Sequence, residues 1–154
     1  MQNNVKALII EYMQEQKLMQ LATVGDDGPW VCSLWQAFDG DMNIYFLSAT
    51  NRQHSLDIEK NSFVAGALAG PHEVGGPARA VQFSGTAKLL TDATDIALAR
   101  SVYQGRIFDA AQIDDFIGST ERPHAFYKIT PTKFVLFDTE NFPENSRQEY
   151  LPEK

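Results

Sequence analysis

A run of hydroxyl and basic residues near the middle of the chain has the composition of an anion site. It lies between two apolar stretches in the segment 42–70, MNIYFLSATNRQHSLDIEKNSFVAGALAG. Its polar members are Ser48, Thr50, Arg52, His54 and Ser55. Residues 52–60 suit a short helix, and the free amides at a helix start attract anions. Since hydroxyl and guanidinium groups also donate hydrogen bonds to phosphate oxygens, the pattern predicts that this turn holds a phosphate.

Each of these residues also has an explanation that needs no ligand. Ser48 and Thr50 could simply end a strand, and Arg52 could form a surface ion pair. His54 could be a solvated or capping side chain. The residue types alone leave both explanations open.

The flanking pattern predicts short strands with helices between them. Alternating apolar residues and turn residues indicate strands at 18–24, 30–38, 43–48, 62–69, 78–90, 124–129 and 133–138. Helical spacing predicts a first helix around Val5 to Met13, and Asp92 and Asp109 are placed to cap two more. Gly85 indicates a bulge or a close backbone approach. Six or seven antiparallel strands with helical inserts predict a mainly β fold, a Greek-key type of barrel.

The predicted strand 30–38 has two different faces. One carries Trp30, Cys32, Leu34, Gln36 and Phe38, and the other carries Val31, Ser33, Trp35 and Ala37. Trp35 could stack beside a planar ring, or it could pack in the core or in a subunit interface. Cys32 has no sequence neighbour that would activate its thiol, so an inert buried thiol is expected.

Composition limits the classes of function. The 154 residues suit a single domain, 1–154, in which 139–154 forms an extended tail. A formal charge of −7 argues against a nucleic-acid partner but permits a small anionic ligand at a local cluster of donors. The single cysteine, the absence of a signal peptide pattern and the absence of a long apolar run predict a cytoplasmic protein with no membrane partner. No metal site is expected, and His124 is expected to have an ordinary strand-edge role.

Three segments, in this order, carry a resemblance to a known family. They are ARAVQFSGTAKLL (78–90), ARSVYQGRIF (99–108) and HAFYKITPTKFVLFD (124–138). Together with the segment 42–70 they resemble the FMN-binding split β-barrel superfamily, which includes pyridoxamine 5'-phosphate oxidase. The sequence is most similar to a small bacterial branch, the YhbP-like proteins, and the resemblance spans roughly residues 5–140.

The resemblance implies a split β-barrel that forms a homodimer and binds FMN where the subunits meet. It places the phosphate at the strand end Leu47-Ser48 and the helix start Arg52–His54, and it adds Arg79 as a further contact. The flavin ring would lie along Ser33, Leu34 and Trp35. The implied function is an FMN-dependent oxidoreductase or flavin reductase, with hydride supplied by a nicotinamide or another small reductant. No residue stands out as an acid, base or nucleophile, which agrees with a cofactor that carries the electrons.

This chain also departs from the family pattern. The family has Arg and Lys where this chain has Val31 and Gln36, and it has Lys at the position of His54. Each lost charge-assisted bond to a phosphate removes about 1.5–3 kcal/mol. A second hypothesis therefore remains, a non-catalytic module that binds haem, deazaflavin or flavin as a planar ligand. The chain lacks the C-terminal Trp-and-Arg segment that holds substrate in pyridoxamine phosphate oxidases, so that activity is not expected.

Overall fold

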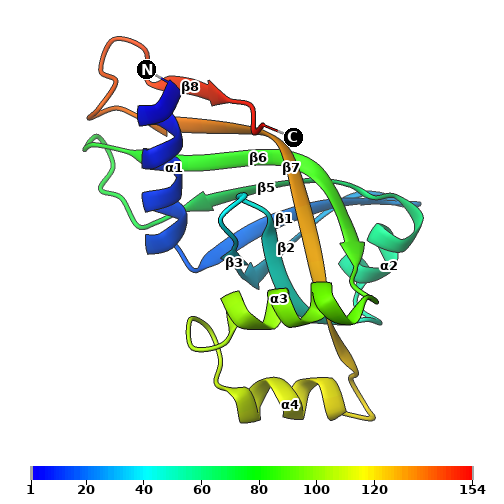
Figure 1. Cartoon of the computed structure of the whole chain (residues 1–154). Helices are drawn as coiled ribbons and strands as arrows, with labels where there is room; N and C mark the ends of the chain where they lie inside the picture. Colours follow the sequence, from blue (N-terminus) through cyan, green and yellow to red (C-terminus); the bar gives the residue numbers. More distant parts are fainter. Residues whose placement is uncertain (1, 154) are drawn as a thin grey trace.

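Residues 2–153 of the computed structural model form one antiparallel sheet, curled into a half-barrel, with four helices (Figure 1). The strands are β1 (Leu18–Gly25), β2 (Gly28–Trp35), β3 (Ala37–Phe38), β4 (Ile44–Ala49), β5 (Phe63–Ala69), β6 (Arg79–Leu89), β7 (His124–Asp138) and β8 (Arg147–Tyr150). The helices are α1 (Gln2–Glu15), α2 (Gln53–Lys60), α3 (Ala93–Tyr103) and α4 (Ala110–Gly118). The strand order is β2-β1-β5-β6-β7-β4-β3, and β8 pairs with β7 beside this path. The predicted mainly β fold, a split barrel, is confirmed.

Strand β7 holds the sheet together because it has three partners. Its first half pairs with β4, its last residues pair with β8, and β6 runs along most of its length. The sequence predicts two strands here, joined through residues 130–132, whereas β7 continues through them. Gly85 explains the difference, because a Cβ at this position would overlap the carbonyl oxygen of Thr130. The predicted bulge is present between Ser84 and Gly85, and it lets the two strands stay paired while they bend.

Two further segments differ from the prediction and raise the strand number to eight among the residues that the structure covers. The predicted strand 30–38 divides into β2 and β3, because Gln36 turns into the interior between them. The predicted extended tail, 139–154, contains β8, which extends the sheet beyond β7.

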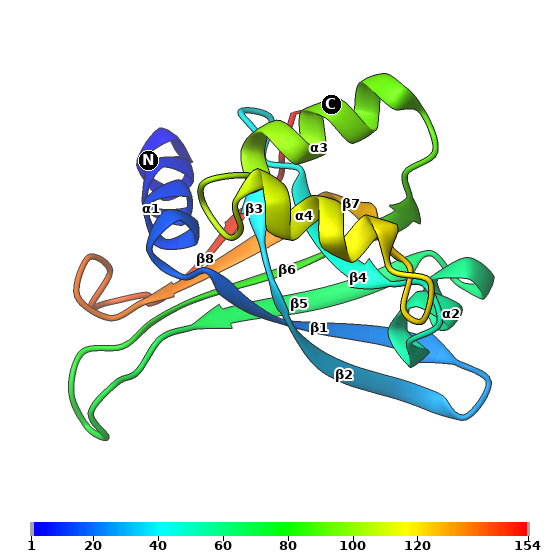
Figure 2. The same cartoon turned by 90° about the horizontal axis from the view of Figure 1, so that it is seen from below.

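Side chains fill two cores, one on each side of β4 and β7. The larger core lies within the curl of the sheet and receives Ile9 and Met13 from α1. The smaller core lies between these strands and the pair α3 and α4, and it includes Tyr103 and Ile113. All six residues of β4 are buried as a result. Figure 2 shows α1, α3 and α4 together on one side of the strands.

The helix starts follow their local sequence. Asp92 accepts hydrogen bonds from the amides of Thr94 and Asp95 and so caps α3. Asp109 forms a capping box with Gln112 at the start of α4. Both predicted caps are confirmed, and they fix where the α3–α4 pair begins against the smaller core.

Candidate functional site

The turn from β4 into α2 gathers the polar residues of the predicted anion site. Arg52 occupies the N-cap position of α2 with an extended backbone, φ −75° and ψ 155°, and its side chain makes no capping hydrogen bond. The helix is tied to the sheet by the buried carboxylate of Asp57, which accepts a 2.7 Å hydrogen bond from Thr23 of β1. The N-cap side chain therefore leaves the first amides of a fixed helix open to an anion.

Ser48 and His54 lie inside this turn and bond to each other. Both are buried, and the Ser48 Oγ is 2.7 Å from the His54 Nε2. Burial lowers the pKa of His54 below its usual value, and the positive charge of Arg52 lowers it further. The imidazole is consequently neutral at pH 7, so it adds no positive charge at the position where the family has a lysine.

The other two hydroxyl groups at the turn bond to backbone carbonyls. Ser55 Oγ donates to the carbonyl oxygen of Ala49 at 2.8 Å, and Thr50 Oγ1 donates to that of Pro123 at 3.4 Å. The second contact joins the turn to the segment just before β7. Three of the five predicted residues, Ser48, His54 and Ser55, thus stabilise the turn from within, whereas Arg52 and Thr50 lie at its outer side.

Arg52 faces a surface hollow that the sequence did not predict. Across residues 2–153 its guanidinium takes part in none of the ion pairs or side-chain hydrogen bonds of the chain. The hollow has a volume of about 430 Å³ and lies between the start of α2, α4 and the start of β7. Arg122 and His124 line it together with Arg52. His124 is therefore part of a charged cluster, although it also opens β7 as predicted.

The predicted ring-binding residues of β2 divide between its two faces. Ser33 and Trp35 are exposed, and the Ser33 hydroxyl donates to Gln20 Oε1 on β1 at 2.8 Å. Leu34 instead packs against the larger core together with Cys32. A flat ligand beside β2 would therefore meet Ser33 and Trp35 through their side chains and Leu34 through its backbone alone.

Position 36, where the family has a lysine, has a structural role in this chain. Gln36 is fully buried, and its Nε2 donates to the carbonyl oxygens of Met13 and Gln16 at the end of α1. Arg106 donates to the carbonyl oxygens of Met13 and Gln36 nearby. The Gln36 side chain thus fixes the C-terminal end of α1 and does not face the exposed side of β2.

Within one chain, Arg79 lies away from the turn, at the start of β6. Arg79 begins β6, whereas the end of β6 near Leu89 approaches α2, roughly 30 Å of extended strand away at about 3.3 Å per residue. Its guanidinium pairs with Asp138 at 3.1 Å and with Glu11 at 3.2 Å. These two ion pairs hold the Arg79 side chain at the far end of the barrel.

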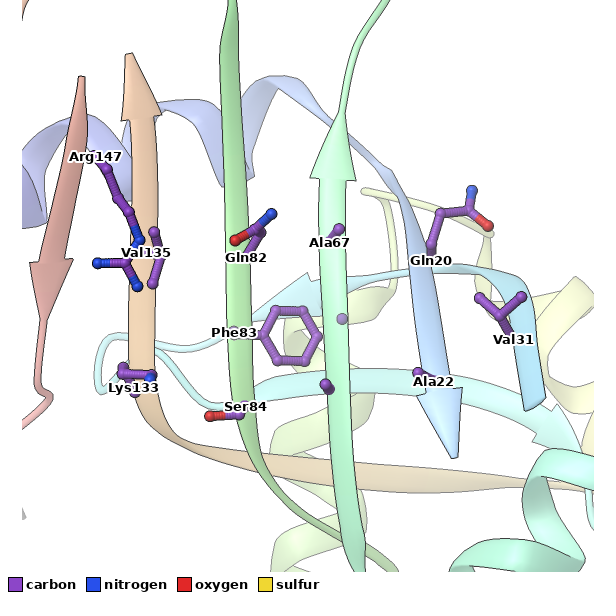
Figure 3. A pocket seen from close by; sticks show the side chains of 12 residues that line it. Gln20, Ala22, Val31, Ala67, Gln82, Phe83, Ser84, Lys133, Val135 and Arg147 are labelled. Atoms are coloured by element: carbon purple, nitrogen blue, oxygen red, sulfur yellow. The ribbon is translucent and has the colours of Figure 1, made fainter. Parts of the chain in front are cut away.

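The outer face of the sheet carries a second hollow of about 430 Å³ (Figure 3). Its floor is made of small side chains on the central strands, among them Ala22, Ala65 and Ala67. Larger apolar side chains are exposed around it on the same face, namely Leu18, Val24, Val31, Trp35, Phe63 and Phe137. Large apolar side chains exposed together on one face are typical of a protein–protein contact, and here they surround a hollow that Gln82, Lys133 and Arg147 also line.

The turn meets part of the requirement for a flavin phosphate. Open amides at the start of α2 and the unpaired Arg52 are donors that a phosphate uses. Three other cations of the family pattern are replaced by Val31, Gln36 and the neutral His54. The site suits an anionic group, with fewer charges than the family pattern provides.

Other kinds of site have less support among residues 2–153. No group of three or more His, Cys, Asp or Glu side chains converges there as a metal would require. The same residues include no helix that is both long enough and apolar enough to cross a membrane. Burial raises the pKa of the Cys32 thiol to about 11, which agrees with an unreactive side chain.

Comparison with known proteins identifies the family. The family model described as pyridoxamine 5'-phosphate oxidase matches residues 5–137. The chain belongs to this family. The match includes the turn, β2 and the outer sheet face, so the site described above lies within the part shared with the pyridoxamine 5'-phosphate oxidase family. No protein among the curated sequences matches the chain.

Solved structures share the fold of this family member at low identity. A conserved hypothetical protein from Mycobacterium tuberculosis has a TM-score of 0.73 at 18% identity, over 90% of this chain and 87% of that one. A Clostridium acetobutylicum protein related to general stress protein 26 of B. subtilis, described as pyridoxinephosphate oxidase family, has a TM-score of 0.71 at 12% identity, over 98% and 96%. A heme binding protein from Mycobacterium smegmatis has a TM-score of 0.70 at 13% identity, over 89% of this chain and 53% of that one.

Proposed function

We propose that this chain is the subunit of a homodimeric FMN-binding protein with oxidoreductase or flavin reductase activity. The family match over residues 5–137 carries the proposal. The phosphate would lie at the start of α2 beside Arg52, and the ring would lie along β2 beside Ser33 and Trp35. Bound FMN would supply the redox chemistry, taking hydride from a nicotinamide or another small reductant. The residues of the chain would bind the phosphate, orient the ring and exclude water.

The second subunit would cover the outer face of the sheet. Six large apolar side chains on that face are at least two-fifths exposed, and Phe63 reaches 69%. Small residues in the centre and large residues around them allow two copies to interdigitate across a two-fold axis. Because β2 forms one edge of this face, association would place the partner next to Trp35 and close the proposed ring site.

A second candidate is a binding module for a planar ligand without catalysis, with haem or deazaflavin in place of FMN. The neutral, buried His54 favours this alternative, because a turn with fewer cations than the family pattern depends less on a phosphate. The structural likeness to a protein whose name describes haem binding agrees with it. On this alternative the ring would still lie beside β2, and the open turn would accept a carboxylate.

Absorbance and titration distinguish the two candidates. Protein purified without added cofactor is scanned for flavin, deazaflavin and haem bands, and the apoprotein is titrated with FMN while flavin fluorescence is followed. We expect FMN to bind, and Arg52→Ala to weaken it roughly tenfold through the loss of one charge-assisted bond. Lys6→Ala, a cation on α1 outside the site, is the matched control. A colourless protein with no heat of FMN binding contradicts the flavin proposal, and stabilisation by haem alone favours the second candidate.

A further inference from the structure

The hollow between α2 and α4 gathers positive charge in a chain that is acidic overall. The formal charge of the chain is −7, yet two guanidinium groups, those of Arg52 and Arg122, line this one hollow. They come from segments about seventy positions apart, which meet because Ala49 pairs with His124 across β4 and β7. The cluster is therefore a product of the sheet register.

These two arginines differ from the other four in the sequence, which all have partners. The other four are Arg79, Arg100, Arg106 and Arg147. Arg79, Arg100 and Arg147 form ion pairs with carboxylates, and Arg106 bonds to backbone carbonyls. In the part of the chain that the structure describes, neither Arg52 nor Arg122 has an acidic partner for its side chain. Both guanidinium groups therefore keep their donors available to a ligand.

Ser119, Phe116 and His124 complete the lining. The His124 Nδ1 lies 2.6 Å from the carbonyl oxygen of Arg122 and donates its proton there, so in this tautomer Nε2 is available as an acceptor, for example for a P–OH group. The Phe116 ring packs beside His124, with ring centroids 4.7 Å apart. Ser119 Oγ accepts from the backbone amide of Arg122 and keeps its own proton to donate. The lining thus combines the Ser119 hydroxyl, which can donate, with the ring of Phe116 beside His124.

We infer that this hollow binds a phosphate group, held between Arg52 and Arg122 with His124 and Ser119 beside it. A phosphate dianion can accept hydrogen bonds from both guanidinium groups at once. A single surface arginine would provide only one of these two groups of donors. Asp115 also lines the hollow, and its carboxylate opposes the anion, but two positive groups outnumber it. The residues of the hollow form this phosphate site whether or not the chain binds a flavin. Inorganic phosphate alone can therefore test it.

The test follows the histidine ring signals by NMR while inorganic phosphate is added at constant ionic strength. We expect the ring signals of His124 to shift with a dissociation constant on the order of 1 mM, and those of His72, in the loop before β6, to stay in place. Arg122→Ala should weaken binding roughly tenfold. Asp115→Asn should strengthen it a few-fold, because it removes the opposing charge. Lys17→Ala is the control and should change nothing.

The outcomes separate this inference from the flavin proposal. His124 signals that do not respond, or a response that Arg122→Ala leaves unchanged, would overturn the phosphate site. Comparing FMN with riboflavin identifies the source of the phosphate. If Arg122→Ala weakens FMN and not riboflavin, the phosphate of the flavin occupies the hollow. If Arg122→Ala changes the affinity for neither flavin, the phosphate belongs to a separate small molecule. If no flavin binds at all, the proposed function fails, and the phosphate titration still tests this site.

Discussion

Replacing Ala67 with arginine should convert the proposed dimer into a monomer. Ala67 lies on β5, in register with Gln20 on one side and Gln82 on the other, at the centre of the outer sheet face (Figure 3). Arginine should disrupt the interface most, because Lys133 and Arg147 already line the hollow there and would repel a further cation. The substitution places an unpaired charge in the middle of the interface without altering the buried face of β5.

The expected effect follows from symmetry. An unpaired charge buried at an interface costs about 3 kcal/mol, and a two-fold interface contains two copies of the substitution. The total of about 6 kcal/mol raises the dissociation constant of the dimer about 10⁴-fold. Sedimentation velocity measures the oligomeric state, and circular dichroism checks that the variant is folded. Ala97→Arg, on an exposed position of α3, is the matched control.

Two results would refute this reasoning. One is a wild-type chain that sediments as a monomer at every concentration tested. The other is an Ala67→Arg variant that stays dimeric at concentrations where the wild type does, because the interface would then lie elsewhere. If FMN binds at a site closed by the partner, its affinity should fall together with the dimer fraction.

Three other predictions concern stability and reactivity. Gly85→Ala should lower the free energy of unfolding by about 2–3 kcal/mol in urea melts, because the new methyl group meets the backbone of β7, whereas Gly40→Ala, in open space, should change it by less than about 0.5 kcal/mol. As the pH falls below about 6.5, the wild type should lose up to about 1.4 kcal/mol of stability per pH unit more than His54→Gln, because burial lowers the pKa of His54 in the fold and the unfolded chain binds the extra proton. Equal slopes in urea melts would contradict this. Alkylation of Cys32 should still accelerate from about pH 8 to about pH 10, because burial raises the pKa of its thiol to about 11; a plateau near pH 9 would show an exposed thiol.

Features set by neighbouring residues could be predicted from the sequence. The caps Asp92 and Asp109 depend on amides two or three positions away, and Gly85 indicates its own bulge. The positions of the strands along the chain up to β6, apart from the division into β2 and β3, follow from alternation and turn residues in the same way. These local signals, with the family resemblance, were enough to predict a split barrel.

Features set by distant residues could not be predicted. Whether His54 points outward or inward depends on how α2 is held by the contact of Asp57 with Thr23, thirty-four positions earlier. The hollow that joins Arg52 to Arg122 depends on the pairing of β4 with β7, which no local pattern encodes. Local sequence therefore shows which residues meet at this turn, but not that the side chains of Ser48, His54 and Ser55 bond within it.

Gly66 opens a direct connection between the two surfaces of the sheet. A Cβ at this position would overlap the ring of Phe83, which belongs to the larger core yet reaches the floor of the outer hollow (Figure 3). The same ring packs against Phe134, with centroids 6.3 Å apart. A molecule bound in this hollow would lie against the ring of Phe83, most of which is in the interior. The proton NMR signals of the Phe83 ring should therefore shift when a molecule binds in the hollow, so binding at the surface can be followed without an added label.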